Sequence, residues 1–387
     1  MPSRIRIKNK TLNRLRTGHL WVYSEEIENP RPEMDGTIVA LESDSGEFVG
    51  QGFFNSRSRI AFRLLGKSPE AIGREFFRDR IQLAGQKREG RIGPEQAVRL
   101  INAEGDLLPG LIADWYAGRI VIQCLIPGTD RLKEMIADIL QEEFQPEAIW
   151  FRNDSGGRGM EGLPEEVFLW KGNADPRVVF REGQVRFEVD LKEGHKTGAY
   201  LDQAENHLRA GELSRGRCLD AFTFQGGFAL HLAAKAEQVM AVDSSAPALS
   251  VLEKNLELNG IKNVKPVKRN IFELLPELER AGEKFDLIAL DPPSFAKSKK
   301  DLHSARRGYA EINRRAVSLL CPSGILLSYS CSYNFSLSEL LEAARWALAD
   351  SGRTGRLLEI QTQAGDHPVL LNMPETWYLK GLVLEVN

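Results

Sequence analysis

The chain has 387 residues, of which 42% are hydrophobic and 27% charged, so it is long enough for two or three domains with sizeable cores. Its formal net charge of −3 argues against wholesale electrostatic binding to nucleic acid but allows a local basic face. Four cysteines without a CxxC pair, and six histidines without metal-ligand spacing, exclude a disulfide framework and make a metal site unexpected. The N-terminal residues do not resemble a secretion signal and no apolar run reaches membrane-spanning length, so we expect a cytoplasmic protein.

Residues 1–67 are expected to form a small β-rich domain. Strands are predicted at 4–7, 37–41, 47–50 and 59–65, with a helix at 12–21. Within the first twenty residues the basic side chains are Arg4, Arg6, Lys8, Lys10, Arg14 and Arg16, with no acid among them. This cluster predicts an RNA-binding face that includes Arg4, Arg6 and Lys8; the alternative is an ordinary solvated strand and helix.

Residues 68–177 are expected to form a small α+β domain. Helices are predicted at 67–91 and 130–143, and strands near 97–101, 111–115, 120–125 and 148–151. The segment 154–172 is rich in glycine and acidic residues, so we interpret it as a loop or domain boundary.

Residues 178–387 show the alternation of strands and helices that is typical of a doubly wound α/β domain. A hairpin is predicted at 178–189. Strands follow at 217–221, 239–242, 264–268, 285–290 and 325–329, and helices at 228–236, 246–259, 304–320 and 337–350. The chain closes with a predicted hairpin of 357–361 and 377–386. This order predicts a parallel, Rossmann-like sheet with an antiparallel C-terminal edge.

The first strand of this domain leads into a glycine-containing loop, Asp220-Ala221-Phe222-Thr223-Phe224-Gln225-Gly226-Gly227. The glycines do not form the GxGxxG spacing that a dinucleotide pyrophosphate needs, so the loop favours a nucleoside without phosphates, or is simply a packing turn. Asp243 ends the second strand, where a carboxylate can accept hydrogen bonds from ribose hydroxyls. Asn270 follows the third strand, beside the expected place of an adenine. Together these features indicate S-adenosylmethionine.

Upstream, residues 196–203 combine a cation, an aromatic ring, a carboxylate and an amide within eight positions. Such a set is suited to the amino-acid part of a ligand. The alternative is a solvated helix start with Asp202 as the N-cap.

Two strand ends carry the residues suited to covalent chemistry. Asp291 precedes a Pro-Pro turn, and Cys331 lies in Ser330-Cys331-Ser332 about forty residues later. In a parallel sheet both ends reach the ligand-binding edge, where a thiol beside a carboxylate suits attack on an electrophilic ring carbon. The alternatives are a small buried cysteine and an aspartate that only forms a turn. Nearby basic residues that could bind phosphates are Lys297, Lys299, Lys300, Arg306 and Arg307, unless they are a solvated face.

Seven stretches, HKTGAYLDQ, DAFTFQGGF, DPPSFAKSK, RRGYAEIN, SYSCS, DHPVL and WYLKG, occur in this order along the chain. With them the chain resembles, over nearly its whole length, the class I S-adenosylmethionine-dependent 23S rRNA (cytosine-5)-methyltransferases that carry an N-terminal PUA domain. The resemblance implies methylation of C5 of a cytosine in large-subunit rRNA through a Cys331–C6 adduct, with Asp291 between cofactor and base. It implies these cofactor-binding residues: Lys196, Thr197, Gly198, Tyr200, Asp202, Gln203, Asp220, Phe222, Phe224, Gly226, Gly227, Asp243, Asn270 and Asp291.

Some positions depart from the family's pattern. Asn270 stands where relatives often have aspartate, and His207 where they commonly have arginine. Asp291 occupies the place of a second cysteine found in another branch, so the base that removes the C5 proton is not identified. The alternatives are a methyltransferase of the same fold acting on guanine or an exocyclic nitrogen, and a non-catalytic RNA-binding assembly factor. The expected partner is large-subunit rRNA, naked or in an assembling particle, and a homodimer is left open.

Overall fold

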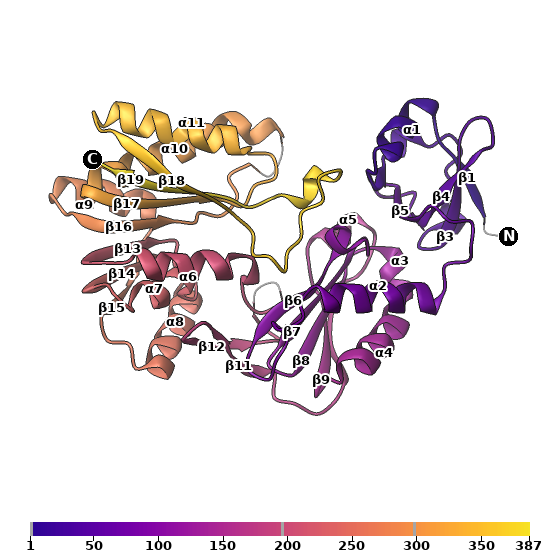
Figure 1. Cartoon of the computed structure of the whole chain (residues 1–387), viewed down its shortest axis with the longest axis horizontal. Coiled ribbons are helices and arrows are strands. Elements are labelled where there is room, and N and C mark those ends of the chain that lie inside the picture. The colour runs from indigo at the N-terminus through magenta and orange to yellow at the C-terminus, as the bar shows by residue number, and fades with distance from the viewer. Residues whose placement is uncertain (1–2, 195–196, 297–298) are drawn as a thin grey trace. The chain divides into compact units, whose positions relative to one another are not determined.

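The fold comes from a computed structural model that describes residues 3–194, 197–296 and 299–387 (Figure 1). Two compact units are present. The first comprises Met1–Phe180, Val189–Ala199 and Gly365–Thr376, and the second comprises Arg181–Glu188, Tyr200–Ala364 and Trp377–Asn387. None of the described helices combines the length and the apolar character needed to cross a bilayer.

The first unit begins with a five-stranded sheet in the order β1-β3-β4-β5-β2. Its elements are β1 (Arg4–Arg6), α1 (Asn9–Arg16), β2 (Trp21–Val22), β3 (Ile38–Glu42), β4 (Phe48–Phe54) and β5 (Phe62–Gly66). The predicted helix at 12–21 lies further upstream, because Gly18 adopts φ of 97° just after the helix ends and β2 starts at Trp21.

A second five-stranded sheet follows in the same unit, in the order β10-β9-β8-β7-β6. The strands are β6 (Ala97–Asn102), β7 (Leu111–Tyr116), β8 (Arg119–Cys124), β9 (Ala148–Asn153) and β10 (Glu166–Lys171), and the helices are α2 (Arg74–Gln86), α3 (Pro127–Arg131), α4 (Lys133–Phe144) and α5 (Gly157–Met160). One buried apolar cluster joins α2 and α4 to this sheet.

The interpretation of 154–172 as a loop was wrong for part of its length. Strand β10 pairs antiparallel with β9, with Phe168 opposite Phe151. The glycines of this segment lie outside the strand, which spans Glu166–Lys171. The later Val-Phe-Leu-Trp run is half-buried on an edge, so its packing, not a clean alternation of polar and apolar residues, makes it a strand.

The predicted hairpin is present as β11 (Arg177–Glu182) and β12 (Val185–Asp190). Within the second unit, Asn255 and Asn259 accept hydrogen bonds from the backbone N–H groups of Glu188 and Arg186, each at 2.8 Å. These bonds attach β12 to helix α8 (Ala246–Asn259).

The second unit contains a seven-stranded sheet of order β15-β14-β13-β16-β17-β19-β18. Its strands are β13 (Arg217–Ala221), β14 (Gln238–Asp243), β15 (Val264–Lys268), β16 (Phe285–Leu290), β17 (Leu320–Ser330), β18 (Gly355–Thr362) and β19 (Lys380–Val386). The other helices are α6 (Ala204–Leu213), α7 (Gly227–Leu232), α9 (Ile271–Arg280), α10 (Leu302–Leu319) and α11 (Leu337–Asp350). The first five strands are parallel and β19 is antiparallel to its neighbours, which confirms the predicted α/β fold.

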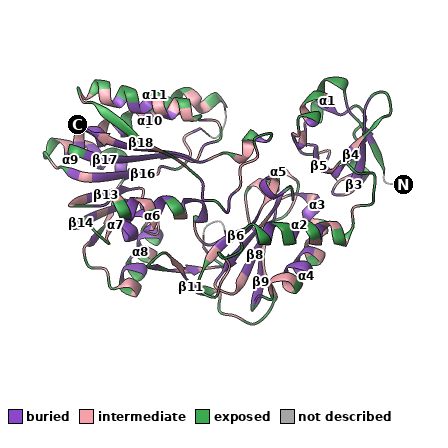
Figure 2. Cartoon of the chain, in the orientation of Figure 1, coloured by how far each residue is buried: buried purple, intermediate pink, exposed green. Residues whose placement is uncertain are grey.

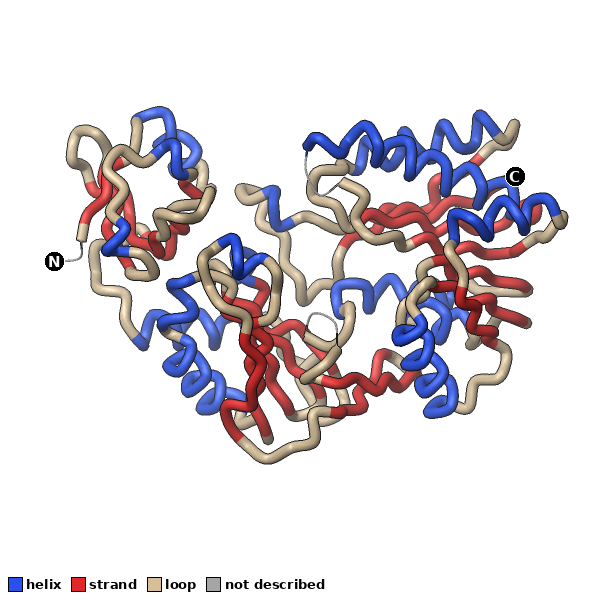
Figure 3. The backbone as a smooth tube through the Cα atoms, turned by 180° about the vertical axis from the view of Figure 1, so that it is seen from behind, coloured by secondary structure: helices blue, strands red, loops and turns tan. Residues whose placement is uncertain are grey.

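Helices cover both faces of this sheet. Helices α9, α10 and α11 lie over one face, while α6, α7 and α8 lie over the other (Figure 1), and the view from behind shows the same layers (Figure 3). The central strands are almost wholly buried (Figure 2). Strand order reverses between β13 and β16, and α/β sheets bind ligands at the carboxyl ends of the strands beside such a reversal.

Helix α9 was missed by the sequence analysis, which expected only a strand end at Asn270. The Asn270 side chain is the N-cap, since its oxygen accepts from Phe272 N–H at 3.0 Å. Pro276 lies inside this helix, and because proline disfavours helix interiors the sequence did not indicate a helix here. Four buried apolar residues, Ile271, Leu274, Leu275 and Leu278, stabilise the helix against the sheet despite that proline.

Candidate active site

The carboxyl ends of four parallel strands bring the predicted residues of the second unit to one edge of the sheet. Ala221 pairs with Leu290 across β13 and β16, so the Asp220 loop and Asp291 leave adjacent strands. Leu290 also pairs with Ser328 of β17, and Cys331 follows three residues later. Asp243 ends β14 on the other side of β13. Residues as far apart in sequence as Asp220 and Cys331 therefore leave strands near the reversal of strand order.

The loop after β13 is held in a strained backbone conformation. Phe222, Phe224 and Gly226 have φ angles of 82°, 50° and 93°. The N–H groups of Phe222 and Thr223 both donate to Val242 O, at 3.0 and 2.8 Å. A Cβ on Gly226 would lie 2.4 Å from a Leu252 methyl group, so a larger residue does not fit there. Non-glycine residues in this region of φ are costly and concentrate where a ligand is bound.

Asp243 and Asn270 combine support of the backbone with spare acceptor capacity. Asp243 accepts from Phe224 N–H at 2.9 Å and from Ser245 N–H at 2.8 Å, one bond to each oxygen. Each carboxylate oxygen retains a second lone pair, which suits the two hydroxyls of a ribose. The Asn270 oxygen already caps α9, and its remaining lone pair is the one an adenine amino group would use.

Asp220 is a buried carboxyl group whose two oxygens have different surroundings. Oδ2 accepts from Thr223 Oγ1 at 2.6 Å and from Ala229 N–H at 2.9 Å. Oδ1 is buried without a hydrogen-bond partner among the described residues. Burial raises the pKa of Asp220 to about 7, against the hydrogen bonds and the charge of His207 that lower it, while the charge of Asp291 raises it further. An unsatisfied buried oxygen at the end of a strand, beside a strained loop, fits a site that is completed by a ligand donor, as the amino-acid part of S-adenosylmethionine would provide.

The segment Tyr200–Gln203 lies against this edge in the second unit. Gln203 donates from Nε2 to Asp291 Oδ2 at 3.0 Å and accepts from Asn206 at 2.6 Å. Tyr200 stacks edge-to-face on Phe224, with ring centroids 5.1 Å apart. Asp202 lies in the 3₁₀ turn Leu201–Gln203 and accepts from Tyr378 Oη at 2.8 Å. The N-cap of α6 is Gln203, so the alternative that Asp202 caps this helix was wrong.

Other predicted cofactor residues lie in the first unit or outside the described part. Thr197 donates to Asp114 Oδ2 at 2.5 Å and lies 3.2 Å from Tyr116 Oη. Gly198 has φ of 149°, and a Cβ there would lie 3.2 Å from the Tyr116 ring. Lys196 lies outside the described residues. The hydroxyl of Thr197 is therefore engaged by buried groups of its own unit.

Cys331 lies in a turn that hydrogen bonds hold on both sides. Ser330 accepts from Tyr309 Oη at 2.8 Å, and Ser332 donates to Ala296 O at 2.7 Å. The Cys331 sulfur lies 4.0 Å from Pro292 O, directly after Asp291, and the residue is partly exposed. By contrast, Cys124 and Cys218 are buried, and burial raises the pKa of Cys218 to about 11. The structure thus places the Cys331 thiol beside the Asp291 loop.

Lys380 is a residue of this site that the sequence analysis missed. It is 4% exposed and donates to Ser332 O at 2.8 Å and Tyr378 O at 3.2 Å. Burial lowers the pKa of Lys380 to about 8, although the nearby charge of Cys331 raises it. In the antiparallel pairing of β19 with β17, Lys380 lies opposite Ser330. The WYLKG motif was a signal in the sequence, but only the antiparallel pairing of β19 with β17 brings its lysine to the cysteine turn.

The predicted RNA-binding residues are mostly exposed, and several have internal partners. Arg4 donates to Glu42 at 2.6 Å, Arg6 lies 4.0 Å from the same carboxylate, and Lys8 donates to Glu25 O at 2.6 Å. The side chains of Arg4 and Arg6 are more than half exposed, whereas the Glu42 carboxylate that they contact is buried.

The second predicted basic group surrounds the start of α10. Arg306 pairs with Glu339 at 2.8 Å and its side chain is 59% exposed. Lys300 and Arg307 are exposed. Lys297 lies outside the described residues, and Lys299 begins the 3₁₀ turn Lys299–Asp301.

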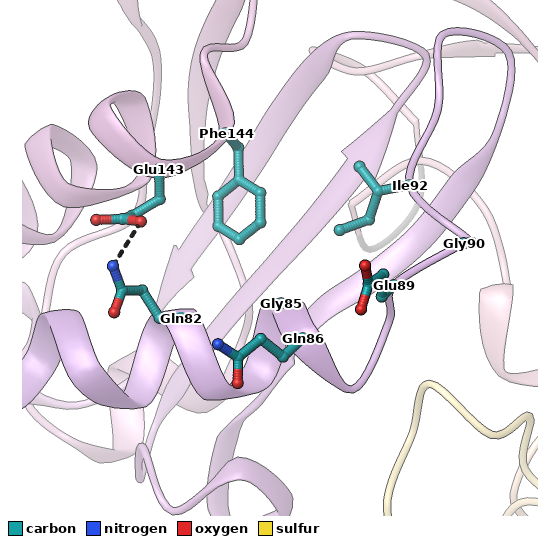
Figure 4. Close-up of a pocket in the computed structure, with 8 residues that line it drawn as sticks. All are labelled: Gln82, Gly85, Gln86, Glu89, Gly90, Ile92, Glu143 and Phe144. Atoms are coloured by element: carbon teal, nitrogen blue, oxygen red, sulfur yellow. Dashed lines mark hydrogen bonds between the residues drawn. The ribbon is translucent and has the colours of Figure 1, made fainter.

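A separate surface groove lies in the first unit (Figure 4). Its volume is about 710 Å³, and it lies between the end of α2 with the following turn and the end of α4. The described lining is Gln82, Gly85, Gln86, Glu89, Gly90, Ile92, Glu143 and Phe144, in which Gln82 donates to Glu143 at 2.9 Å. It contains none of the predicted site residues, so the chemistry is assigned to the strand ends rather than to this groove.

Comparison with known families agrees with this architecture. Residues 151–350 match the family described as "S-adenosylmethionine-dependent methyltransferase", and residues 5–67 match "PUA-like domain".

Curated relatives match along almost the whole chain. "Ribosomal RNA large subunit methyltransferase I" of Aeromonas hydrophila is 38% identical over 379 residues, covering 95% of this chain and 96% of the relative. The protein of the same name from Tolumonas auensis is 39% identical over 377 residues, covering 95% of both chains. That of Shewanella amazonensis is 36% identical over 395 residues and covers both chains fully.

Among solved structures, SMU.776 in complex with SAH superposes with a TM-score of 0.86 at 19% identity, covering 99% of this chain and 100% of that one. A second structure, from Streptococcus mutans, has a TM-score of 0.85 at 18% identity and the same coverage. At this identity the likeness concerns the fold alone.

Proposed function

Because this chain belongs to the family of ribosomal RNA large subunit methyltransferase I, which is S-adenosylmethionine-dependent, we propose that it methylates C5 of a cytosine in large-subunit rRNA. Membership of this family confirms the predicted cofactor. The choice of base and atom is our proposal, and it rests on the residues at the strand ends.

One observation carries the proposal: a partly exposed thiol and a carboxylate leave adjacent strands at the reversal of strand order. Cys331 follows β17, Asp291 follows β16, and the sulfur lies 4.0 Å from the carbonyl oxygen of Pro292. Methylation of an exocyclic or ring nitrogen needs no nucleophilic thiol, since the nitrogen lone pair attacks directly. Methylation of C5 of cytosine needs one, because this carbon is too weakly nucleophilic to attack a sulfonium methyl group unaided.

In the proposed reaction, the Cys331 thiolate adds to C6 of the cytosine. The new S–C6 bond shifts the electron pair of the C5–C6 double bond toward C5, which becomes the nucleophile. When bound, S-adenosylmethionine supplies an electrophilic methyl group on sulfur. C5 forms the carbon–carbon bond, the methyl–sulfur bond breaks, and a base then removes the C5 proton. Departure of the thiolate restores the double bond and frees Cys331.

Asp291 is proposed to bind the N3/N4 edge of the cytosine in this reaction. A carboxylate there stabilises a protonated ring while the adduct exists. Two features hold the group in place: the Gln203 amide donates to Oδ2 at 3.0 Å, and Pro292 and Pro293 restrict the backbone that follows. The Ser332–Ala296 bond at 2.7 Å joins this loop to the cysteine turn, which supports a fixed distance between the two groups.

We also propose which residues bind the cofactor and the rRNA phosphates. The cofactor would be held by Tyr200 to Gln203, the Asp220–Gly227 loop, Asp243 and Asn270. The rRNA phosphates would be held by the two basic groups, at the N-terminus and around α10, consistent with a PUA-like domain at residues 5–67. The domain boundaries proposed from the sequence are 1–67, 68–177 and 178–387.

Lys380 is expected to support Cys331. Changing Lys380 to Met removes the ammonium group from Ser332 O and Tyr378 O and also removes a positive charge near the thiolate. We expect single-turnover methyl transfer to fall about 10- to 100-fold, the cost typical of a misplaced reacting group. Alkylation of Cys331 by iodoacetamide at pH 7 should slow about tenfold, because the thiolate is the reactive form and the neighbouring positive charge that stabilises it is lost.

The matched control is Lys284→Met, which also removes a lysine that donates to a backbone carbonyl, Ser318 O at 2.6 Å. This variant should transfer methyl groups at the unaltered rate. Wild-type rates of both transfer and alkylation in Lys380→Met would remove Lys380 from the proposed site.

The test of the function is transfer of a labelled methyl group from S-adenosylmethionine to large-subunit rRNA that lacks the modification, followed by nucleoside analysis. Naked rRNA and ribosomal subunits are both assayed, because RNA structure decides which base is accessible. The proposal expects 5-methylcytosine. A methylated guanine or an N-methylated base would overturn the C5 chemistry while keeping the cofactor and fold. Absence of transfer to either substrate would favour an RNA-binding assembly factor.

A further inference from the structure

Three buried side chains form a cluster beneath the cofactor loop of the second unit. Glu182 ends β11, His207 lies in α6 and His231 lies in α7. One oxygen of Glu182, Oε1, lies 2.8 Å from His207 Nδ1 and 3.0 Å from His231 Nε2. The side chains of the three residues are 6–9% exposed. The two rings stack with centroids 5.9 Å apart. Both imidazoles therefore share a single carboxylate oxygen.

The cluster touches the first turn of α7, which begins directly after the strained loop. A Cβ on Gly227 would lie 2.5 Å from His207 Cε1 and Nε2, so the ring packs against the backbone there. The Phe228 ring meets His207 edge-to-face at 4.6 Å. Gly211 of α6 permits this closeness, because a Cβ there would lie 2.9 Å from His231 O. His207 therefore contacts both the Glu182 carboxylate and the end of the loop Asp220–Gly227.

His207 also carries charge at this place. The charged groups that act on it are Glu182 on β11, Asp220 on β13 and Asp291 after β16, and the titratable ring of His231 on α7 stacks against it. Burial by itself lowers the pKa of His207, but the charge and hydrogen bond of Glu182, followed by the charges of Asp291 and Asp220, outweigh it and raise the pKa above 6.5. Burial by itself raises the pKa of Glu182, but the charges and hydrogen bonds of His207 and His231 outweigh burial and lower this pKa to about 2.

We propose that His207 is a positioning residue of the cofactor site: together with Glu182 and His231 it forms a proton-holding cluster that fixes the start of α7 and balances the buried acids Asp220 and Asp291. Affinity for the cofactor then depends on the proton of this cluster. The inference rests on S-adenosylmethionine binding and is independent of which base is methylated. Its failure is therefore distinguishable from failure of the cytosine proposal.

The direction of the pH effect follows from the charges. Below its raised pKa, His207 is an imidazolium that stabilises the folded loop and the carboxylate of Asp220. That contribution is fully present below pH 6.5, the ordinary value, and disappears as the pH rises through the higher value in the folded protein. Cofactor affinity should weaken over the same pH interval. The change is up to about tenfold for each unit by which the pKa of His207 differs between the cofactor-bound and the cofactor-free protein.

The test measures the dissociation constant of S-adenosylmethionine by calorimetry on the full chain between pH 6 and 9. The variants are His207→Arg, a permanent cation, and His207→Gln, which has no charge, with the exposed His303→Gln as the matched control. The amino group of the ligand has a pKa of about 8 and therefore also titrates within this pH range, so the informative quantity is the ratio of wild-type to His207→Arg affinity.

We expect this ratio to fall about tenfold between pH 6.5 and 9, and His207→Gln to bind about tenfold more weakly than wild type at pH 6.5. His303→Gln should follow wild type throughout. A ratio that stays constant with pH, or wild-type affinity in His207→Gln, would overturn the proposal.

Two further measurements keep the inference testable if a His207 variant does not fold. His231→Gln should reduce cofactor affinity at pH 6.5 in the same direction, and a wild-type value would count against the cluster. The ligand atoms of the three residues lie within 4.8 Å of one another, so purified protein is also analysed for zinc. One equivalent of zinc per chain, lost in His231→Gln, would replace the proton-holding role, because metal ligation needs unprotonated nitrogens.

Discussion

Replacing Cys331 by alanine is expected to reduce methyl transfer to rRNA by at least about 1,000-fold, since removing a covalent nucleophile eliminates the step that activates the base. Affinity for S-adenosylmethionine should stay within about twofold, because Asp220 accepts hydrogen bonds from Thr223 and Ala229, and Asp243 accepts from the N–H groups of Phe224 and Ser245. The turn should also persist, since Ser330 and Ser332 make its hydrogen bonds with Tyr309 and Ala296. The measurements are single-turnover transfer and calorimetric binding of the cofactor.

A trapped complex gives an independent readout of the same prediction. In RNA with 5-fluorocytidine at the target, the fluorine on C5 cannot leave as a proton does, so the protein should stay covalently attached and migrate with the RNA on a denaturing gel. Cys331→Ala should lose this band, whereas Cys321→Ala, the other partly exposed cysteine, should keep both the band and the transfer rate. Transfer at the wild-type rate by Cys331→Ala would refute the covalent mechanism.

Replacing Asp291 by asparagine should lower the transfer rate about 100- to 1,000-fold, the effect typical of removing one electrostatic stabiliser of the transition state. The substitution keeps the shape, and its amide oxygen still accepts from Gln203, which now donates to Oδ2 at 3.0 Å. The substitution therefore removes only the negative charge of Asp291. We therefore expect kcat to fall much more than cofactor affinity, and the covalent band with 5-fluorocytidine to form slowly.

Asp286→Asn is the matched control for this change. Asp286 lies near the start of β16, the strand that Asp291 follows, and its carboxylate accepts from Arg217 N–H at 2.9 Å, a bond that an amide oxygen preserves. This control should transfer at close to the unaltered rate. If Asp291→Asn had the same rate as Asp286→Asn, Asp291 would be a turn former and not part of the chemistry.

Much of the second unit could be predicted from the sequence because its local signals agree with its tertiary structure. Runs of apolar residues predicted the five parallel strands, and the ends of these runs carry Asp220, Asp243, Asp291 and, one residue beyond β17, Cys331. Parallel strands end at the same edge, so the meeting of these residues follows from the pattern alone. Their strand pairing bears this out, with Leu290 opposite both Ala221 and Ser328.

Elements stabilised by their neighbours were harder to predict. Helix α9 contains Pro276, a residue that disfavours helices, and forms because its four buried apolar residues pack on the sheet. Strand β10 is a half-buried edge strand whose pairing with β9 outweighs its flanking glycines. In both cases the free energy comes from contacts distant in sequence, which a local window does not contain.

By itself, the sequence determined the fold class and the cofactor, because these depend on hydrophobic periodicity and on residue types at fixed spacing, and it predicted which strand ends carry the proposed chemistry. The tertiary structure decided which side chains support that chemistry. Lys380 reaches the turn of Cys331 only because β19 runs antiparallel to β17, and Glu182 binds His207 and His231 only because a hairpin and two helices pack together. Charges interact through space over a few ångströms, and the chain brings such charges together only by folding.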